Sequence, residues 1–318
     1  MKKYLAIIFA VIMLASLTAC GSDTKGSSSA TEATSQSEPE TQEATLTAEK
    51  GEVKDSSPAI DQLEKAGYDT SLLNEPKVNY ADKDFGFQLE KPEKGDTVAV
   101  IKTSMGDITL RFFPEYAPNT VNNFVELAKA GKYDGVLFHR VMNDFMIQTG
   151  DYENNNGTGG TSIYGSAFED EFCDKLLNIR GSVAMANSGR DTNGSQFFIN
   201  QSKSSSAIEQ YKSNWKSIVS QLKATKDQPS SVAVLNNYGT SCLNTDAVPD
   251  EMVKLYEENG GNIWLDGAYN PSDAGHTVFA QVIDGMDVVD KIAAVDVDST
   301  TSKPLEDVTI DTVEIKEY

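Results

Sequence analysis

The sequence predicts a mainly β fold built around a closed barrel, and two observations support this. Many short segments alternate apolar and polar residues or hold short apolar runs, and turn-forming residues separate them. Few segments show the apolar spacing of three and four residues that is typical of an amphipathic helix. Many short strands with few helices favour closure of the sheet, since closure removes its exposed edges.

The first nineteen residues are predicted to be a signal peptide. Lys2 and Lys3 are followed by an apolar run, Leu5 to Leu17, that is too short to cross a bilayer as a helix. The run Leu17-Thr18-Ala19-Cys20-Gly21 resembles a bacterial lipobox, whose cysteine is diacylated after cleavage. We therefore expect Cys20 to anchor the chain on the extracytoplasmic face of the cell membrane. The alternative is an ordinary secretory signal that happens to contain a cysteine.

Residues 20–57 are rich in Ser, Thr, Glu, Gln and Ala and are expected to form a disordered tether. Residues 58–94 are mixed in composition and are predicted to form an N-terminal arm. Within the arm, Ala59 to Ala66 has the pattern of one short helix. The folded domain is expected to cover residues 95–318.

The barrel elements follow in order. Thr97 to Thr103 and Ile108 to Phe113 are predicted strands, with a turn at Ser104 to Asp107. Pro118 is placed to open a helix that Gly131 ends, with Val121, Phe124, Val125 and Ala128 on one apolar face. Four further strands are predicted at Val136 to Val141, Met146 to Gln148, Gly181 to Ala186, and Phe197 to Asn200.

Charge and motif content argue against several classes of function. The formal net charge of −21 repels a phosphate backbone, so nucleic acid is not an expected partner. The two histidines, His139 and His276, belong to no cluster with metal-ligand spacing, so no metal is expected. Gly157 to Gly160 lacks the lysine of a nucleotide loop and is interpreted as a turn. The sequence shows no activated nucleophile and therefore predicts chemistry without a cofactor.

Cys173 and Cys242 are the only cysteines after Cys20. Outside the cell they could form a disulfide, provided that their Cα atoms lie within about 7 Å. The alternative is two small buried side chains. The sequence leaves both possibilities open.

Two segments combine large apolar residues with uncharged amides, namely Phe138 to Asp151 and Gly181 to Phe198. Strand alternation predicts that Phe138, Arg140 and Met142 share one face and that His139 faces away from Arg140. An arginine flanked by large apolar side chains is costly unless it is paired or functional. Arg140 is therefore either a functional residue or one member of an ion pair with an aspartate.

At this point the sequence resembles a known family, the cyclophilins. Both segments are similar to the cyclophilin signature stretches, and further matches follow at Asn156 to Gly165, Phe168 to Glu171, Trp264 to Gly267, His276 to Phe279, and Gly285 to Val289. The resemblance covers roughly residues 95 to 318. It implies an eight-stranded antiparallel barrel capped by two helices, with a substrate groove on the outer face.

The resemblance also implies the site and its partners. Arg140 resembles the catalytic arginine of a peptidyl-prolyl cis-trans isomerase, and the implied partners are proline-containing polypeptides, including exported or cell-surface proteins. Trp264 is similar to the rim residue that the family uses to bind cyclosporin-type ligands, whereas Phe197 is expected in the core. The residues implied in substrate binding are Phe145, Met146, Gln148, Gly157, Ala186, Asn187, Gln196, Phe198, Trp264, Leu265 and His276.

The chain departs from the family pattern in two insertions, at residues 199–263 and 268–275. The longer insertion contains two expected helices, one opening at Ser206 with apolar spacing from Ile208 to Leu222, and one at Pro249 to Glu258. We expect these helices to form a folded appendage at the rim of the groove.

One alternative function for the protein is a proline-peptide-binding module or holdase with little turnover. A lipid-anchored solute-binding protein would need alternating strands and helices, which are missing.

Overall fold

The computed structural model describes residues 52–54, 56–68, 70, 71, 73, 77–204, 208–225, 235 and 237–318, all within one compact unit, Leu46–Tyr318. The predicted signal peptide, Cys20 and most of the predicted tether lie outside the described residues. Across the described ranges, no helix is both long enough and apolar enough to cross a membrane.

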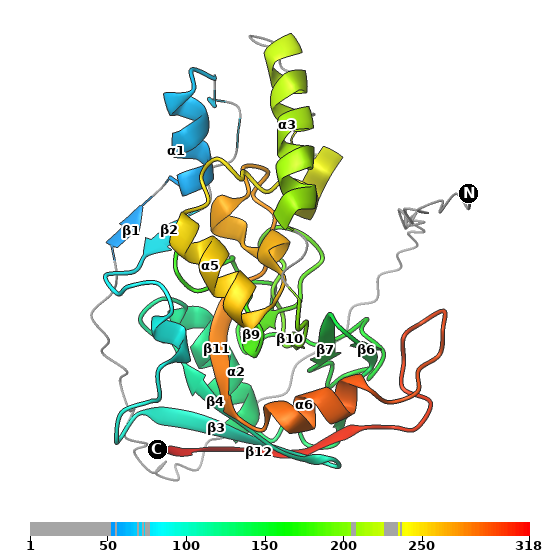
Figure 1. The fold of residues 1–318 in the computed structure, drawn as a ribbon. Coiled ribbons are helices and arrows are strands. Elements are labelled where there is room, and N and C mark those ends of the chain that lie inside the picture. The colour runs from blue at the N-terminus through cyan, green and yellow to red at the C-terminus, as the bar shows by residue number, and fades with distance from the viewer. Residues whose placement is uncertain are drawn as a thin grey trace, which may run out of the picture. The chain divides into compact units, whose positions relative to one another are not determined.

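The central feature is an antiparallel sheet whose strand order is β5-β12-β3-β4-β11-β9-β10-β7-β6 (Figure 1). Its longest pairings are those of β12 with β3 and of β3 with β4. The β3–β4 pair is the hairpin that the sequence predicts. The strands are β3 Thr97–Thr103, β4 Gly106–Phe112, β5 Val136–Leu137, β6 Arg140–Met142, β7 Met146–Thr149, β9 Ser182–Met185, β10 Phe197–Asn200, β11 Val278–Asp284 and β12 Thr309–Glu317.

The two ends of this strand order meet. β5 and β6 are consecutive stretches of chain that only Phe138 and His139 separate. On either side of the interruption, the Phe138 amide donates to the Val308 carbonyl over 2.9 Å and the Val141 amide donates to the Ser302 carbonyl over 2.8 Å. Counted as one interrupted strand, β5 and β6 give the eight strands that the cyclophilin resemblance implies.

Two helices cover the barrel core, α2 Pro118–Lys129 and α6 Met286–Ala293. α2 begins at Pro118, as predicted, and presents Val121 and Phe124 to the core. The Phe124 ring lies 5.3 Å from that of Phe197, in an edge-to-face arrangement. The sequence prediction of a mainly β fold with two capping helices is therefore confirmed.

The N-terminal arm is part of the folded unit. It contains α1 Pro58–Lys65, β2 Val78–Tyr80 and the 3-10 turn η1 Phe87–Leu89. It is preceded by β1 Glu52–Lys54, which falls within residues 20–57, so regular structure begins inside the segment that the sequence predicts to be a disordered tether. β2 pairs with β1 and, in parallel, with β8 Phe172–Cys173. The predicted short helix is thus confirmed, and β2 joins the arm to β8 in a three-stranded sheet, β1-β2-β8, that is separate from the barrel sheet.

The long insertion supplies α3 Ile208–Ala224, the 3-10 turn η2 Gly239–Ser241 and α5 Asp250–Asn259. Trp215, Ile218 and Leu222 of α3 pack with Leu63 of α1, so the insertion buries part of its apolar stripe against the arm. Both helices lie at the same end of the folded unit (Figure 1). The folded appendage is therefore confirmed for the described residues, whereas the expected capping residue Ser206 lies outside them.

The predicted long insertion, residues 199–263, meets regular structure at both of its ends. Ile199 and Asn200 belong to β10 and pair with β7. At the other end, Ile263 opens a 3-10 turn, η3 Ile263–Leu265, which is followed by η4 Gly267–Tyr269. Strand β10 runs two residues into the predicted insertion because its ladder with β7 extends that far.

Cys173 and Cys242 are both buried and free, so the alternative of two small buried side chains is the correct one. They pack in different apolar clusters, Cys173 with Phe113 and Cys242 with Trp215. Burial raises the pKa of each thiol to about 12.

Candidate active site

Apolar side chains cluster where β7, β10 and η3 meet, the place that the cyclophilin resemblance implies for the proline pocket. Met146, Phe198 and Leu265 are buried in one cluster there, with Phe145 and Trp264 partly buried beside them. Phe198 pairs with Gln148 on one side of β10 and with Ala184 on the other. Its neighbour Phe197 faces the barrel core, as strand alternation predicts.

Two aromatic contacts define the pocket walls. The Phe145 and Trp264 rings stack with centroids 5.6 Å apart, and Phe198 meets the His276 ring edge-on at 5.2 Å. Nδ1 of His276 lies 2.8 Å from the Met185 carbonyl, which can only accept, so Nδ1 carries the proton. Burial lowers the pKa of His276, which makes this wall neutral at neutral pH.

Arg140 lies at the edge of this pocket on β6 and is half-buried. Its guanidinium donates to Oε1 of Gln148 over 3.3 Å, contacts Sδ of Met142 at 3.1 Å, and lies 5.9 Å from the centre of the Phe145 ring. None of these partners is a carboxylate, so the alternative of an aspartate ion pair is not supported by the described residues. Burial lowers the pKa of Arg140, but an arginine still remains charged at neutral pH.

The alternation predicted across residues 138–142 was only partly correct. Met142 does lie with the pocket beside Arg140, but Phe138 is buried in the barrel core together with Val141. The strand is interrupted at Phe138 and His139, and this interruption shifts the alternation by one position. His139 is buried, and its ring lies against Gly157, where an added Cβ would come within 3.1 Å of it.

A chain of side-chain amides extends from Arg140 along the groove. Gln148 accepts from Arg140 and donates through Nε2 to Oε1 of Gln196 over 3.0 Å. Gln196 in turn donates to the carbonyls of Gly157 at 3.0 Å and Gly159 at 2.7 Å. The guanidinium is therefore held through two glutamines, one on β7 and one directly before β10.

Beyond the amides is a cleft of about 190 Å³. Its lining includes five of the residues that the resemblance implies, namely Gln148, Gly157, Ala186, Asn187 and Gln196. The other six pack in or against the apolar pocket. The structure therefore gathers all of the predicted site residues except the lipidation residue Cys20, which lies outside the described residues.

Asp151 is a supporting residue that the sequence analysis did not single out. Its carboxylate accepts from four backbone amides, those of Asn154 at 2.9 Å, Asn156 at 3.1 Å, Gly157 at 2.8 Å and Gly159 at 3.2 Å. These hydrogen bonds lower the pKa of Asp151, although its burial opposes them. An aspartate directly before a run of Asn and Gly is the available signal, since such residues form side-chain-capped turns.

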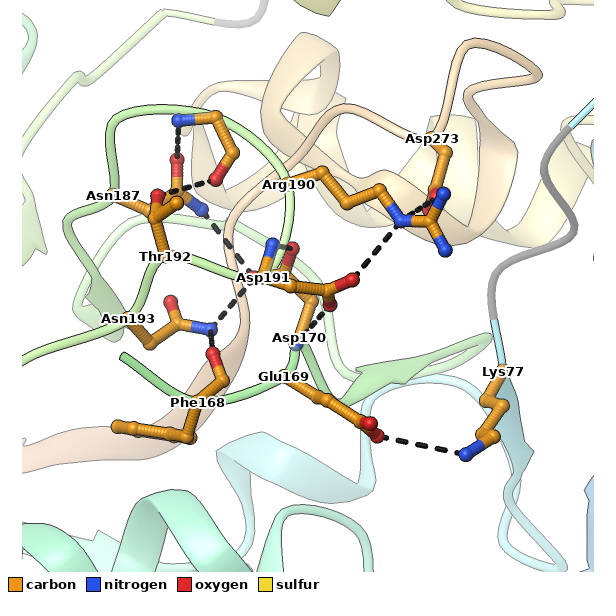
Figure 2. Close-up of polar contacts among 11 residues, drawn as sticks. Lys77, Phe168, Glu169, Asp170, Asn187, Arg190, Asp191, Thr192, Asn193 and Asp273 are labelled. Atoms are coloured by element: carbon orange, nitrogen blue, oxygen red, sulfur yellow. Dashed lines mark hydrogen bonds and ion pairs between the residues drawn. The ribbon is translucent and has the colours of Figure 1, made fainter. Parts of the chain in front are cut away.

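Hydrogen bonds and ion pairs from charged side chains hold the loop that follows Asn187 (Figure 2). Asp170 accepts from the Asp191 amide at 2.9 Å and from Nδ2 of Asn193 at 2.8 Å. Arg190 pairs with Asp191 at 3.0 Å and with Asp273 of the small insertion at 2.5 Å. The small insertion thus contacts the groove through an ion pair. Nowhere in the described ranges do three His, Cys, Asp or Glu residues group so as to hold a metal ion.

Comparison with known proteins decides the family. The model of the cyclophilin type peptidyl-prolyl cis-trans isomerase/CLD family matches residues 98–233 and 240–315. A Staphylococcus aureus (strain COL) protein named as a peptidyl-prolyl cis-trans isomerase is 42% identical over 231 residues, which are 72% of this chain and 98% of that protein. The chain belongs to the cyclophilin-type peptidyl-prolyl cis-trans isomerase family. The resemblance stated from the sequence is therefore confirmed.

Other cyclophilin-type relatives extend the comparison. A Streptococcus pyogenes serotype M6 protein, named as a bifunctional phosphatase/peptidyl-prolyl cis-trans isomerase, is 39% identical over 262 residues. That match covers 79% of this chain but 47% of the streptococcal protein, so the chain spans about half the length of that relative. A Cryptosporidium parvum cyclophilin-type crystal structure matches 70% of this chain and 99% of its own at 25% identity, with a TM-score of 0.46. A second C. parvum structure, obtained in the presence of the dipeptide Ala-Pro, matches at 24% identity with a TM-score of 0.45.

Proposed function

We propose that this cyclophilin-type protein isomerises X-Pro bonds in exported or cell-surface proteins while Cys20 anchors it to the membrane. One observation carries the catalytic part of the proposal. The Arg140 guanidinium lies beside an apolar pocket of Met146, Phe198 and Leu265 and is held by the neutral side chain of Gln148. A charge placed in this way is available to a substrate.

The chemistry follows from the nature of the X-Pro bond. Amide resonance gives the bond partial double-bond character and a barrier of about 20 kcal/mol. In the twisted transition state the lone pair of the prolyl nitrogen is localised and can accept a hydrogen bond. A guanidinium that donates to this nitrogen stabilises the transition state more than the planar substrate, which is the requirement for catalysis.

The surrounding residues supply binding and orientation. The apolar walls hold the proline ring and exclude water, which strengthens the electrostatic effect of Arg140. Asn187 and Gln196 line the adjoining cleft and offer polar groups to the substrate backbone. No proton transfer, metal or cofactor is required by this mechanism.

The substrate class is a proline-containing polypeptide. The S. aureus and S. pyogenes relatives, whose names include a peptidyl-prolyl cis-trans isomerase, support this class. Trp264, stacked on Phe145 at the pocket edge, is proposed to contact cyclosporin-type ligands as well. The net charge of −21 argues against nucleic acid as a partner.

The test of function is turnover of a short proline peptide by the full-length chain in detergent. An isomerase accelerates the cis-to-trans conversion at protein concentrations far below that of the peptide. A holdase binds the peptide and leaves the conversion rate at its uncatalysed value. The second outcome would overturn the proposal of catalysis.

Anchoring is tested separately through Cys20, for which the Leu-Thr-Ala-Cys run is the support. Cys20→Ser removes the thiol that would be acylated and is expected to release the protein from membranes into the medium. A variant that still fractionates with membranes would show that the anchor lies elsewhere.

A further inference from the structure

A buried hydrogen bond joins helix α5 of the long insertion to the segment that carries the wall of the proline pocket. Tyr256 lies on α5 and is only 2% exposed. Its hydroxyl donates a hydrogen bond to Oδ2 of Asp266 over 2.5 Å. Asp266 directly follows Trp264 and Leu265, which form part of the pocket wall.

Asp266 organises the backbone around this wall. Its Oδ1 accepts from both the amide and Nδ2 of Asn178, at 2.8 and 2.9 Å. Nδ2 of Asn178 also lies 3.4 Å from the carbonyl of His276, and the His276 amide donates to the Leu265 carbonyl over 3.0 Å. The carboxylate is thus linked to both segments that carry pocket side chains.

The same network reaches the strand that carries Phe198. Nδ2 of Asn200 donates to Oδ1 of Asn178 over 3.0 Å, and Nδ2 of Asn262 donates to Oδ1 of Asn200 over 2.7 Å. All three asparagines are buried, and buried polar groups of this kind are costly unless they are satisfied. The network therefore has one preferred arrangement, in which Tyr256 is the contribution of helix α5.

From these contacts we infer that Tyr256 and Asp266 are positioning residues for the proline pocket. Through them the inserted helix α5 sets the placement of Leu265 and His276 and thereby the affinity for the proline ring. This inference rests on the proposed function and adds to it a role for the insertion. The insertion acts on the active site from behind the pocket wall.

Tyr256→Phe is the direct test, since it removes one hydroxyl and keeps the ring in its cluster. Because the pocket walls bind the proline in the ground and transition states alike, KM for a proline peptide should rise about threefold or more with kcat nearly unchanged. Tyr269→Phe is the matched control. Tyr269 is also 2% exposed and belongs to the same cluster, but its hydroxyl donates to the Asp174 carbonyl. We expect this control to leave KM unchanged.

A second readout does not depend on turnover. The chain has two tryptophans, Trp215 and Trp264. In a Trp215→Phe background, Trp264 at the pocket edge is the only tryptophan, so the tryptophan emission reports on the pocket. In this background, Tyr256→Phe should shift the Trp264 emission and weaken its response to a proline peptide. Tyr269→Phe should do neither.

Asp266→Asn keeps the shape of the side chain and decides the question if Tyr256→Phe fails to fold. KM of the double variant should rise by less than the product of the rises in the two single variants, because both substitutions act on the same Tyr256–Asp266 hydrogen bond. Unchanged KM and unchanged Trp264 emission in a folded Tyr256→Phe or Asp266→Asn variant would overturn the inference. Absence of turnover in the parent would instead overturn the proposed function.

Discussion

Asp151→Asn should loosen the loop that holds Gln196, and the hydrogen bonds of Asp151 set the size of the effect. Oδ1 of Asp151 accepts from the Asn154 amide, and Oδ2 accepts from three further amides. An asparagine has one carbonyl oxygen, so at least one of these bonds is lost and an NH2 group then faces an N–H. A hydrogen bond to a charged group contributes about 1.5–3 kcal/mol.

We therefore expect Asp151→Asn to lower the free energy of unfolding by about 2–3 kcal/mol. In a domain of this size that corresponds to a fall in Tm of about 5–10 °C. Because the loop carbonyls hold Gln196 in the groove, KM for a proline peptide should also rise about threefold. Urea unfolding followed by circular dichroism, together with the peptide assay, measures both effects.

The pH dependence gives an independent check. The folded state lowers the pKa of Asp151, so its contribution to stability is complete above the unfolded value of about 4. The contribution is lost as pH falls through the folded pKa. The difference in unfolding free energy between parent and variant should therefore be constant from pH 7 to about 5 and shrink at lower pH.

Asp298→Asn is the matched control for this prediction. Asp298 also accepts from two backbone amides, those of Thr300 at 2.9 Å and Thr301 at 2.8 Å, but none of these three residues lines the cleft. We expect the control to lower stability by less than Asp151→Asn does and to leave KM unchanged. If both variants changed stability and KM equally, the proposed role of Asp151 would be refuted.

Two further predictions concern buried titratable groups. Burial lowers the pKa of both His276 and His139, so stability should decline through either residue as pH falls below about 6.5. The value of kcat/KM should decline over the same range through His276, which lies in the pocket wall, so His276→Gln should remove the acid limb of kcat/KM while His139→Gln keeps it. An acid limb that survives in His276→Gln would contradict the assignment. Burial also raises the pKa of Cys173 and Cys242 to about 12, so a thiol reagent should label both only after unfolding in urea. Rapid labelling of the folded protein would contradict their burial.

Local sequence patterns predicted most of the barrel correctly. Thr97 to Thr103 and Phe197 to Asn200 are strands with the predicted ends, and Pro118 opens its helix. These features depend on side-chain alternation and on the fixed backbone angle of proline, which are properties of neighbouring residues. The roles of the site residues came from the family resemblance, because aromatic and aliphatic residues such as Phe198 and Leu265 otherwise resemble ordinary core residues.

The features that sequence reasoning missed depend on distant contacts. The interruption at Phe138 and His139 follows from the way in which β5 and β6 bond to different segments near the C-terminus, and no local pattern marks it. The pairing of the arm could not be predicted because its partner strand, β8, lies far along the chain. The sequence places Tyr256 only within the predicted helix Pro249 to Glu258. Its hydrogen bond to Asp266 exists only in the folded chain and could not be predicted from that pattern.

The central claim is that the Arg140 guanidinium stabilises the twisted X-Pro bond, and kcat/KM of Arg140→Ala on a proline tetrapeptide tests it most directly. Loss of one charged hydrogen bond, about 1.5–3 kcal/mol, predicts a fall of at least tenfold and up to about 150-fold. Arg140→Lys keeps the charge but loses the planar fork, and its kcat/KM should lie between those of the parent and Arg140→Ala. Circular dichroism confirms that each variant is folded. A folded Arg140→Ala variant with the turnover of the parent would contradict the account.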